Sequence, residues 1–191
     1  MNVHHVFAEH TEVMRAASAT LPGVLNDAID ALQKCLGQGN KVLACGNGGS
    51  AAAAQHFVAE LVCRFRVDRR ALPAIALSAD VMTLTAIGND YGYSHIFARQ
   101  VEALANRGDV LVAISTSGKS ANVIKAAQAA RTAGCAVIAL TGADGGKLAA
   151  NSDIVIGIPS HVVARIQEVH DICIHAIAEA LEERARSSVE Q

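Results

Sequence analysis

Five short runs of mostly apolar residues, separated by longer stretches with helical periodicity, constrain the fold of this chain more than any other feature. The runs are Lys41–Cys45, Ala74–Leu77, Asp109–Ser115, Cys135–Thr141 and Asp153–Ile158. Successive side chains of a strand point to opposite faces of a sheet, so a run that is apolar at consecutive positions predicts a strand buried on both faces. Such strands are typical of a parallel sheet covered by helices on both sides.

The stretches between these runs have the periodicity of amphipathic helices. The clearest are Ser50–Phe65, Ser94–Asn106, Ser120–Ala133 and Val162–Arg186. The residues before the first run also have a helical pattern, and Pro22 indicates the start of a second helix there, because proline is favoured at the first helical position. The alternation predicts an α/β fold: a three-layer, doubly wound, five-stranded parallel sheet of the flavodoxin-like type, with an N-terminal helical extension.

The length of 191 residues suits one domain, and no linker-like or low-complexity segment interrupts the chain. We therefore expect a single domain over residues 1–191, with N-terminal helices in residues 1–40 and an α/β core in residues 41–191 that ends in a long helix. Apolar residues make up 51% of the chain but aromatic residues only 3%, so small aliphatic side chains must fill the core. The apolar excess also favours faces buried between subunits, and we expect an oligomer.

Charge and cysteine usage exclude several classes of function. The net charge is −2 and no run of Lys or Arg occurs, so we expect no nucleic-acid partner. No apolar segment is long enough for a membrane span, and the N-terminus lacks the features of a signal peptide. The five cysteines are an odd number without a C-x-x-C pair, which predicts free thiols in a reducing cytoplasm.

Two of the predicted strands end in similar loops of small residues, each followed by a helix. One loop is Gly46–Ser50 and the other is Ser115–Ser120. Ligands of open α/β sheets bind beyond the carboxyl ends of the strands, near the point where the strand order reverses. The two loops should therefore be neighbours that frame one pocket.

The second loop has the groups that a phosphate needs. It offers backbone N–H groups before a helix and four hydroxyls, those of Ser115, Thr116, Ser117 and Ser120. An ordinary helix-capping turn rich in Ser and Thr is the alternative interpretation. Neither G-x-x-x-x-G-K-[ST] nor G-x-G-x-x-G is present, so nucleoside triphosphates and dinucleotides are disfavoured as ligands.

Titratable residues are spaced to share helix faces in two other segments. His56 and Glu60 are four residues apart, and Gln167 and His175 are eight apart, which is about 11 Å along an ideal helix axis. An aldose–ketose isomerisation needs one group to move a proton between adjacent carbons and another to manage the oxygens. Glu60 and His175 are suitable for these tasks, although polar faces of solvated helices have the same spacing.

Several segments together resemble the sugar isomerase (SIS) domain family and, within it, the phosphoheptose isomerases, over essentially the whole chain. They are Cys45–Ser50, Ala54–Phe57 with Glu60, Ile87–Gly92, Ser115–Ser120 and Arg165–His170. The Ser-Thr-Ser-Gly loop alone is shared by many SIS proteins. Its combination with His56, Glu60, Gln167 and His175 is specific to the phosphoheptose isomerases.

The resemblance implies conversion of sedoheptulose 7-phosphate to D-glycero-D-manno-heptose 7-phosphate, for the heptose of bacterial lipopolysaccharide. It implies that Glu60 is the carbon base and His175 its acid/base partner. The implied substrate contacts, with sugar or phosphate, are Asn47, Gly48, Gly49, Ser50, Glu60, Asn89, Asp90, Ser115, Thr116, Ser117, Ser120 and Gln167.

Similar enzymes hold zinc (Zn²⁺) through the positions of His56, Glu60, Gln167 and His175, and form homotetramers with active sites between subunits. Two imidazoles, a carboxylate and a weakly binding amide oxygen are a chemically reasonable set for zinc. Two positions depart from the family: members commonly have Asp at the position of Ala53, and some have Asp at the position of Ala164. An Asp one turn before His56 would orient its imidazole, so Ala53 predicts weaker zinc binding.

Two other SIS functions are alternatives. One is a non-catalytic SIS tetramer that binds the bacterial replication initiator, which lacks counterparts of Glu60 and His175. The other is a sugar-phosphate sensor that controls transcription, which needs a separate DNA-binding domain for which 191 residues leave no room. The presence of both Glu60 and His175 favours the enzyme.

Overall fold

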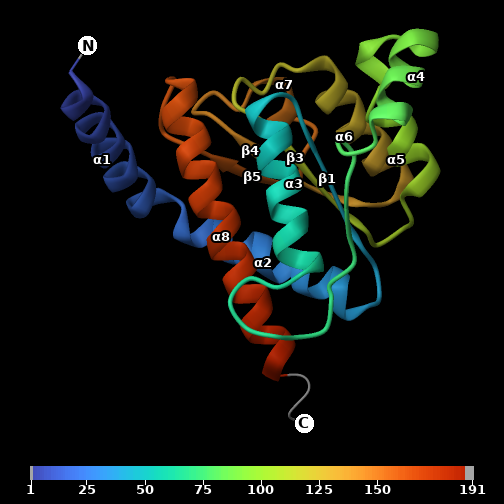
Figure 1. Ribbon diagram of the computed structural model, residues 1–191, viewed down its shortest axis with the longest axis horizontal. Helices are drawn as coiled ribbons and strands as arrows, with labels where there is room; N and C mark the ends of the chain where they lie inside the picture. Colours follow the sequence, from blue (N-terminus) through green and yellow to red (C-terminus); the bar gives the residue numbers. More distant parts are fainter. Residues whose placement is uncertain (1, 188–191) are drawn as a thin grey trace.

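The computed structural model describes residues 2–187, and these residues contain a five-stranded, all-parallel sheet with helices on both sides (Figure 1). The strands are β1 Val42–Gly46, β2 Ala74–Ala76, β3 Val110–Ser115, β4 Ala136–Thr141 and β5 Ile154–Gly157. Their order is β2-β1-β3-β4-β5, so the strand order reverses between β1 and β3. The predicted doubly wound fold is confirmed, and each strand lies within one residue of its predicted ends.

Burial on both faces holds for the centre of the sheet and fails at its edge. Every residue of β1 and β3 is buried. The edge strand β2 is only three residues long, and its Ile75 is 37% exposed. The prediction of two buried faces was wrong for β2, because an edge strand has a neighbour on one side only and helices cover it incompletely.

The helices agree with the predicted stretches except around residues 80–106 and at residues 146–149, where no helix was predicted. They are α1 Val3–Thr20, α2 Pro22–Gly37, α3 Gly49–Val62, α4 Val81–Tyr91, α5 Ala98–Leu104, α6 Ala121–Ala133, α7 Gly146–Ala149 and α8 Val163–Ser187. Pro22 begins α2, as predicted. The predicted helix Ser94–Asn106 is instead a 3₁₀ turn, η1 (Tyr93–His95), followed by the short α5. No residue of α4 is fully buried, although Leu84 and Ile87 pack against an apolar cluster.

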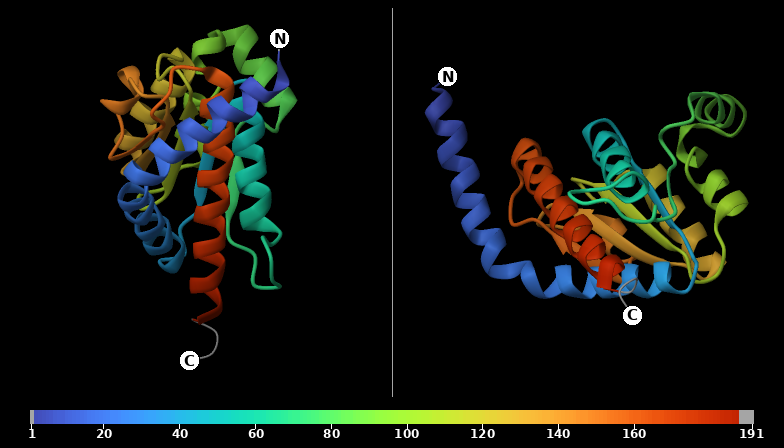
Figure 2. Two further views of the ribbon diagram at one scale, coloured as in Figure 1. Left: turned by 90° about the vertical axis from the view of Figure 1, so that its left-hand side faces the viewer. Right: turned by 60° about the horizontal axis from the view of Figure 1, so that its bottom comes forward.

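Two apolar clusters lie on opposite faces of the sheet and account for the three layers. One joins α2, α3 and α8 to the sheet through residues such as Leu32, Phe57 and Ile174. The other joins α5 and α6 through residues such as Val101 and Ala126. Figure 2 shows the sheet between these helices, with α1 leaning outward beside α8. Among the described residues, no helix has the length and apolar character that a bilayer span requires.

Candidate active site

The loops that follow β1 and β3 lie side by side, as predicted. The two strands pair in parallel up to Gly46 and Ile114. Beyond them, the amides of Asn47 and Asn122 form two reciprocal hydrogen bonds, in which Asn47 Nδ2 donates to Asn122 Oδ1 at 2.9 Å and Asn122 Nδ2 donates to Asn47 Oδ1 at 2.8 Å. The Tyr93 hydroxyl donates to the same Asn47 oxygen at 2.9 Å.

Asn122 and Tyr93 therefore belong to the candidate site, although neither was predicted from the sequence. Asn122 is buried in the first turn of α6, two residues after the hydroxyl-rich loop. The position of Asn122 in that turn could have indicated its role, because a buried amide needs a polar partner and the two loops are its nearest polar neighbours. Tyr93 comes from η1, in the segment where the helix prediction was wrong.

The hydroxyl loop, residues Ser115–Ser120, presents its side chains in two directions. The hydroxyls of Ser115 and Ser120 lie 3.1 Å apart and are hydrogen bonded to each other. Thr116 and Ser117 instead line a cavity of about 180 Å³, together with residues that include Asp144, Ser160 and His161. Helix α6 begins directly after the loop, so the positive end of its dipole faces this edge of the sheet.

The loop is packed closely against the turn after β4. Gly118 has a φ of +61°, and a Cβ atom there would lie 2.0 Å from the carbonyl oxygen of Gly145. A side chain at position 118 would therefore displace either the loop or the turn. This close packing fixes where the backbone N–H groups of the loop point.

Helices α3 and α8 lie side by side and bring His56, Glu60 and His175 together (Figures 1 and 2). His56 Nε2 is 3.1 Å from Glu60 Oε1 and 3.4 Å from His175 Nε2. One ligand atom from each residue lies within 4.8 Å of the other two. These three residues are called the α3–α8 cluster below.

The donor set of the α3–α8 cluster suits a metal ion. Ligand atoms at the usual zinc distances of about 2.0–2.2 Å in a tetrahedral site are about 3.3–3.6 Å from one another, close to the separations in the cluster. His56 Nε2 faces both a carboxylate oxygen and a second imidazole nitrogen. A cation at the meeting point would satisfy all three groups at once. The residues present therefore fit zinc.

Gln167, the fourth expected ligand, lies further toward the start of α8. Its amide packs against Gly49, where a Cβ atom would lie 2.4 Å from Gln167 Nε2. Gly49 begins α3 and precedes His56 by seven residues. The absence of a side chain at Gly49 thus lets the amide reach the loop after β1, while its role as a ligand stays a prediction.

The two positions that depart from the family differ in environment. Ala53 is buried in the apolar cluster beneath α3, whereas Ala164 is exposed in the first turn of α8. An Asp at position 53 would lose its hydration, so it would need a partner such as the imidazole of His56, one turn further on.

Asn89 and Asp90 are not brought to the loops. They lie exposed near the end of α4, and Asn89 Nδ2 donates to Asp90 Oδ1 at 2.8 Å. Among the described residues, no hydrogen bond links either side chain to the hydroxyl loop or the α3–α8 cluster. Figure 1 shows α4 apart from α3 and α8. Their contact with a sugar stays a prediction.

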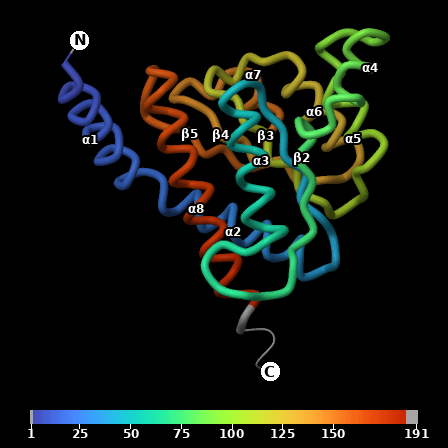
Figure 3. Tube along the Cα trace, in the orientation of Figure 1, coloured from blue at the N-terminus to red at the C-terminus, as the bar shows by residue number. Residues whose placement is uncertain are grey.

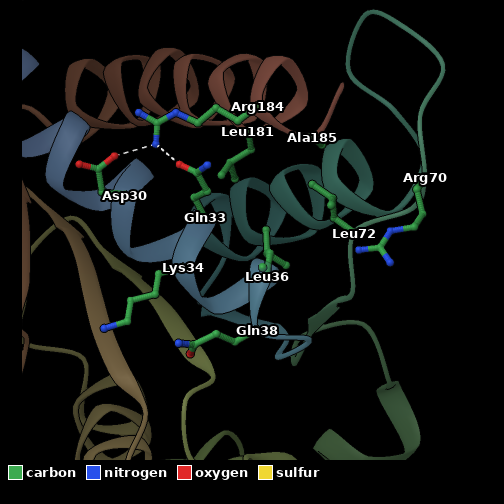
Figure 4. A pocket seen from close by; sticks show the side chains of 11 residues that line it. Asp30, Gln33, Lys34, Leu36, Gln38, Arg70, Leu72, Leu181, Arg184 and Ala185 are labelled. Carbon is green, nitrogen blue, oxygen red and sulfur yellow. Dashed lines mark hydrogen bonds and ion pairs between the residues drawn. The ribbon is translucent and has the colours of Figure 1, made fainter. Parts of the chain in front are cut away.

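A second cavity lies elsewhere, with a volume of about 850 Å³ between α2, α8 and the chain near Arg70 and Leu72 (Figure 4). Arg184 Nη1 donates to Asp30 Oδ1 at 2.6 Å on its wall. None of the expected site residues lines this cavity, which is close to the amino end of β1.

Comparisons with known proteins show the family of this chain. The model of the SIS domain matches residues 5–142. A phosphoheptose isomerase of Aliarcobacter butzleri is 51% identical over 176 residues, which are 92% of this chain and 93% of that protein. The structure of a phosphoheptose isomerase from Neisseria gonorrhoeae superposes with a TM-score of 0.90 at 47% identity, covering 95% of this chain and 97% of the other. A phosphoheptose isomerase structure from Francisella tularensis gives 0.92 at 41% identity, covering 95% and 96%.

Proposed function

This chain belongs to the SIS domain family, among the phosphoheptose isomerases, and we propose that its reaction converts sedoheptulose 7-phosphate to D-glycero-D-manno-heptose 7-phosphate. It is an enzyme, and a sugar-phosphate isomerase. The alternative of a non-catalytic tetramer that binds the replication initiator has no support from these relatives. The proposed place of the reaction is the cytoplasmic supply of heptose for lipopolysaccharide, and the five free cysteines agree with a reducing compartment.

The observation that carries the proposal is the α3–α8 cluster. A carboxylate from α3 and an imidazole from α8 meet at one place, although more than one hundred residues separate them in sequence. Glu60 Oε1 and His175 Nε2 both contact His56 Nε2, so the two groups that an enediol mechanism needs lie within reach of one small substrate.

The proposed proton transfers balance within the cluster. The Glu60 carboxylate takes a proton from C1 of the ketose and returns it to C2. Meanwhile the ring nitrogen of His175 that is not a zinc ligand gives its proton to the carbonyl oxygen on C2 and then takes one from the hydroxyl on C1. The intermediate is a 1,2-enediol, and both side chains end in the protonation states in which they began.

Zinc is the proposed cofactor, held by His56, Glu60 and His175 with Gln167 as the fourth ligand. Bound there, it supplies a Lewis acid for the oxygens of the substrate. The cluster supports this because His56 Nε2 lies 3.1 Å from Glu60 Oε1 and 3.4 Å from His175 Nε2, close to the spacing of ligand atoms around a tetrahedral ion. Side-chain exposure of 42% for His56 and 20% for Glu60 leaves the cluster open to an ion and a substrate.

The proposed phosphate contacts come from the hydroxyl loop. Thr116 and Ser117 line the small polar cavity, and Ser115 and Ser120 lie at the start of α6. Neutral donors at a helix N-terminus stabilise an anion without titrating near neutral pH. Sugar contacts are proposed for Asn47, Gly48, Gly49, Ser50, Asn89 and Asp90.

A homotetramer with active sites between subunits is the proposed assembly. Large apolar side chains are exposed on α1 and α4, among them Phe7 and Met82, and these faces suit burial against other subunits. Assembly would also give Asn89 and Asp90 a site to contact in a second copy. Light scattering should give about four times the chain mass of 19.8 kDa. A monomer would contradict the shared site.

The central experiment incubates the protein with sedoheptulose 7-phosphate and zinc and follows aldose formation by NMR. We expect a new anomeric signal that grows with enzyme concentration. Sedoheptulose without its phosphate is the matched control and should turn over far more slowly, because it lacks the group that the hydroxyl loop binds. No aldose from the phosphorylated ketose, in zinc-loaded protein, would overturn the proposed reaction.

A further inference from the structure

The loop between α3 and β2, residues 63–73, passes beneath the ends of α3 and α8 before it reaches the sheet (Figure 3). It has no regular secondary structure of its own. Its first residues nevertheless lie beside the α3–α8 cluster, because Phe65 packs against His175 with ring centroids 5.4 Å apart. The groups that hold this loop in place therefore also affect the position of Phe65 against His175.

One buried carboxylate holds the start of the loop. Glu182 on α8 is 3% exposed, and it accepts hydrogen bonds from the backbone N–H groups of Phe65, Arg66 and Val67 at 2.8, 2.8 and 2.9 Å. Burial raises the pKa of Glu182, but the three N–H donors and the nearby Arg69 outweigh it and hold the pKa below its ordinary value. Glu182 is thus a charged acceptor for three successive peptide groups.

Arg69 extends this connection to the end of α3. Its Nε lies 3.5 Å from Glu182 Oε2. Its Nη2 donates to the backbone carbonyl of Glu60 at 2.6 Å, and its Nη1 donates to the carbonyl of Leu61 at 2.9 Å. A cation that caps the last carbonyls of a helix stabilises that end. Here the capped residues include Glu60 itself.

The His175 imidazole lies between two rings. His56 contacts it edge to face, with centroids 4.9 Å apart and planes at 87°, and Phe65 packs on it at 39°. The position of Phe65 depends on the peptide groups that Glu182 holds. A loop that lost this attachment would remove one of the two rings that fix the orientation of His175.

We propose that Glu182 is a positioning residue for the α3–α8 cluster. By binding residues 65–67 and Arg69, it places Phe65 against His175 and caps α3 at Glu60, so that the two reacting groups keep their mutual orientation. Glu182 itself touches neither. The inference rests on the proposed function where it is tested by turnover. The orientation of His175 can be measured by NMR without any reaction.

The test compares Glu182→Gln and Phe65→Leu with the parent protein. Glu182→Gln keeps the shape but removes the charge and turns an amide N–H₂ toward the N–H donors. Phe65→Leu keeps an apolar side chain and leaves the Glu182 attachment intact. We expect each variant to lower kcat by about 10-fold to 100-fold with KM changed less than about twofold, because small misplacements of supporting groups cost this much.

The second readout is NMR of the histidine rings in metal-free protein, with the His175 signals assigned from a His175→Gln variant. Loss of the Phe65 ring current should shift the His175 ring protons in both variants, while the buried His170 signals stay. Glu179→Ala is the matched control. Glu179 lies one turn before Glu182 and pairs with the exposed Arg66 side chain, so its loss should leave kcat and the His175 signals unchanged.

Folded variants with parental kcat and unshifted His175 signals would overturn the proposal, and so would a Glu179→Ala variant as impaired as Glu182→Gln. If Glu182→Gln does not fold, Glu182→Asp, which keeps the charge but shortens the side chain, is judged by the same two readouts. A parent protein without isomerase activity would instead refute the proposed function, and the ring signals would still test the positioning role.

Discussion

The hydroxyl loop and the α3–α8 cluster differ in their chemical groups and in the elements that hold them. The loop offers neutral hydroxyl and N–H groups, held by a tight turn against the buried centre of the sheet. The cluster offers titratable groups on the middle and end of two helices that are partly open to solvent. Binding of the phosphate and movement of protons are therefore assigned to separate elements. Changes in the loop should alter affinity, and changes in the cluster should alter turnover.

The largest expected effect is on turnover, from Glu60→Gln. The change is nearly isosteric and removes only the basic carboxylate. A positioned general base contributes about 10²–10⁴-fold to rate, so kcat should fall by that factor while the affinity for inorganic phosphate stays. Steady-state kinetics and phosphate competition measure the two quantities.

A fall of less than tenfold, in a variant with parental phosphate affinity, would show that Glu60 is not the base. Since Glu60 is also a proposed zinc ligand, zinc content is measured in the same samples. A variant that has lost zinc is assayed again at saturating zinc, so that the missing base and the missing ion are separated.

The next effect is on the stability of the fold. It comes from His170, which is buried on α8 five residues before His175. His170 Nε2 lies 3.1 Å from the carbonyl oxygen of Thr141, and burial lowers the pKa of His170 from 6.5 to about 4 despite that hydrogen bond. The unfolded chain takes up this proton near pH 6.5 and the folded chain only near pH 4. The free energy of unfolding should therefore decrease as pH falls from about 6.5 to about 4, by up to about 3 kcal/mol.

Denaturant unfolding at several pH values, in the presence of a chelator, measures this decrease. His170→Gln keeps an N–H donor for the Thr141 carbonyl but cannot titrate, so its stability should depend less steeply on pH between 6.5 and 4. Equal slopes for the two proteins would show that His170 is not the group responsible.

A smaller effect, on affinity alone, is expected from Ser117→Ala and Ser120→Ala. Each loses a hydrogen bond to a charged phosphate, worth about 1.5–3 kcal/mol, while kcat at saturation stays near the parental value. Calorimetry with inorganic phosphate and with substrate measures the loss. Thr132→Ala is the control, because the Thr132 hydroxyl on α6 bonds only to the Gln128 carbonyl of its own helix. Equal affinity for sedoheptulose with and without its phosphate would remove the loop from the site.

The same two regions differ in how far sequence alone predicts them. The hydroxyl loop is contiguous, and its strand, its small residues and the start of α6 are all readable in order. The cluster is predictable only in pieces, as His56 with Glu60 and Gln167 with His175 on shared helix faces. That α3 lies beside α8 follows from the crossovers that place both helices on one face of the sheet. The reciprocal hydrogen bonds between Asn47 and Asn122 were not predicted, because Asn122 was not recognised in the sequence as a site residue.

The sequence by itself determined the sheet, the start of α2 at Pro22 and the loop chemistry, because these depend on periodicity, backbone restrictions and neighbouring residues. It did not reveal α4, whose residues are all at least partly exposed. Only the tertiary structure decided which residues meet across helices: His56 with His175, Glu182 with residues 65–67, and Gln167 with Gly49. Such contacts depend on the relative placement of whole helices, which is set by how their apolar faces pack on a common sheet.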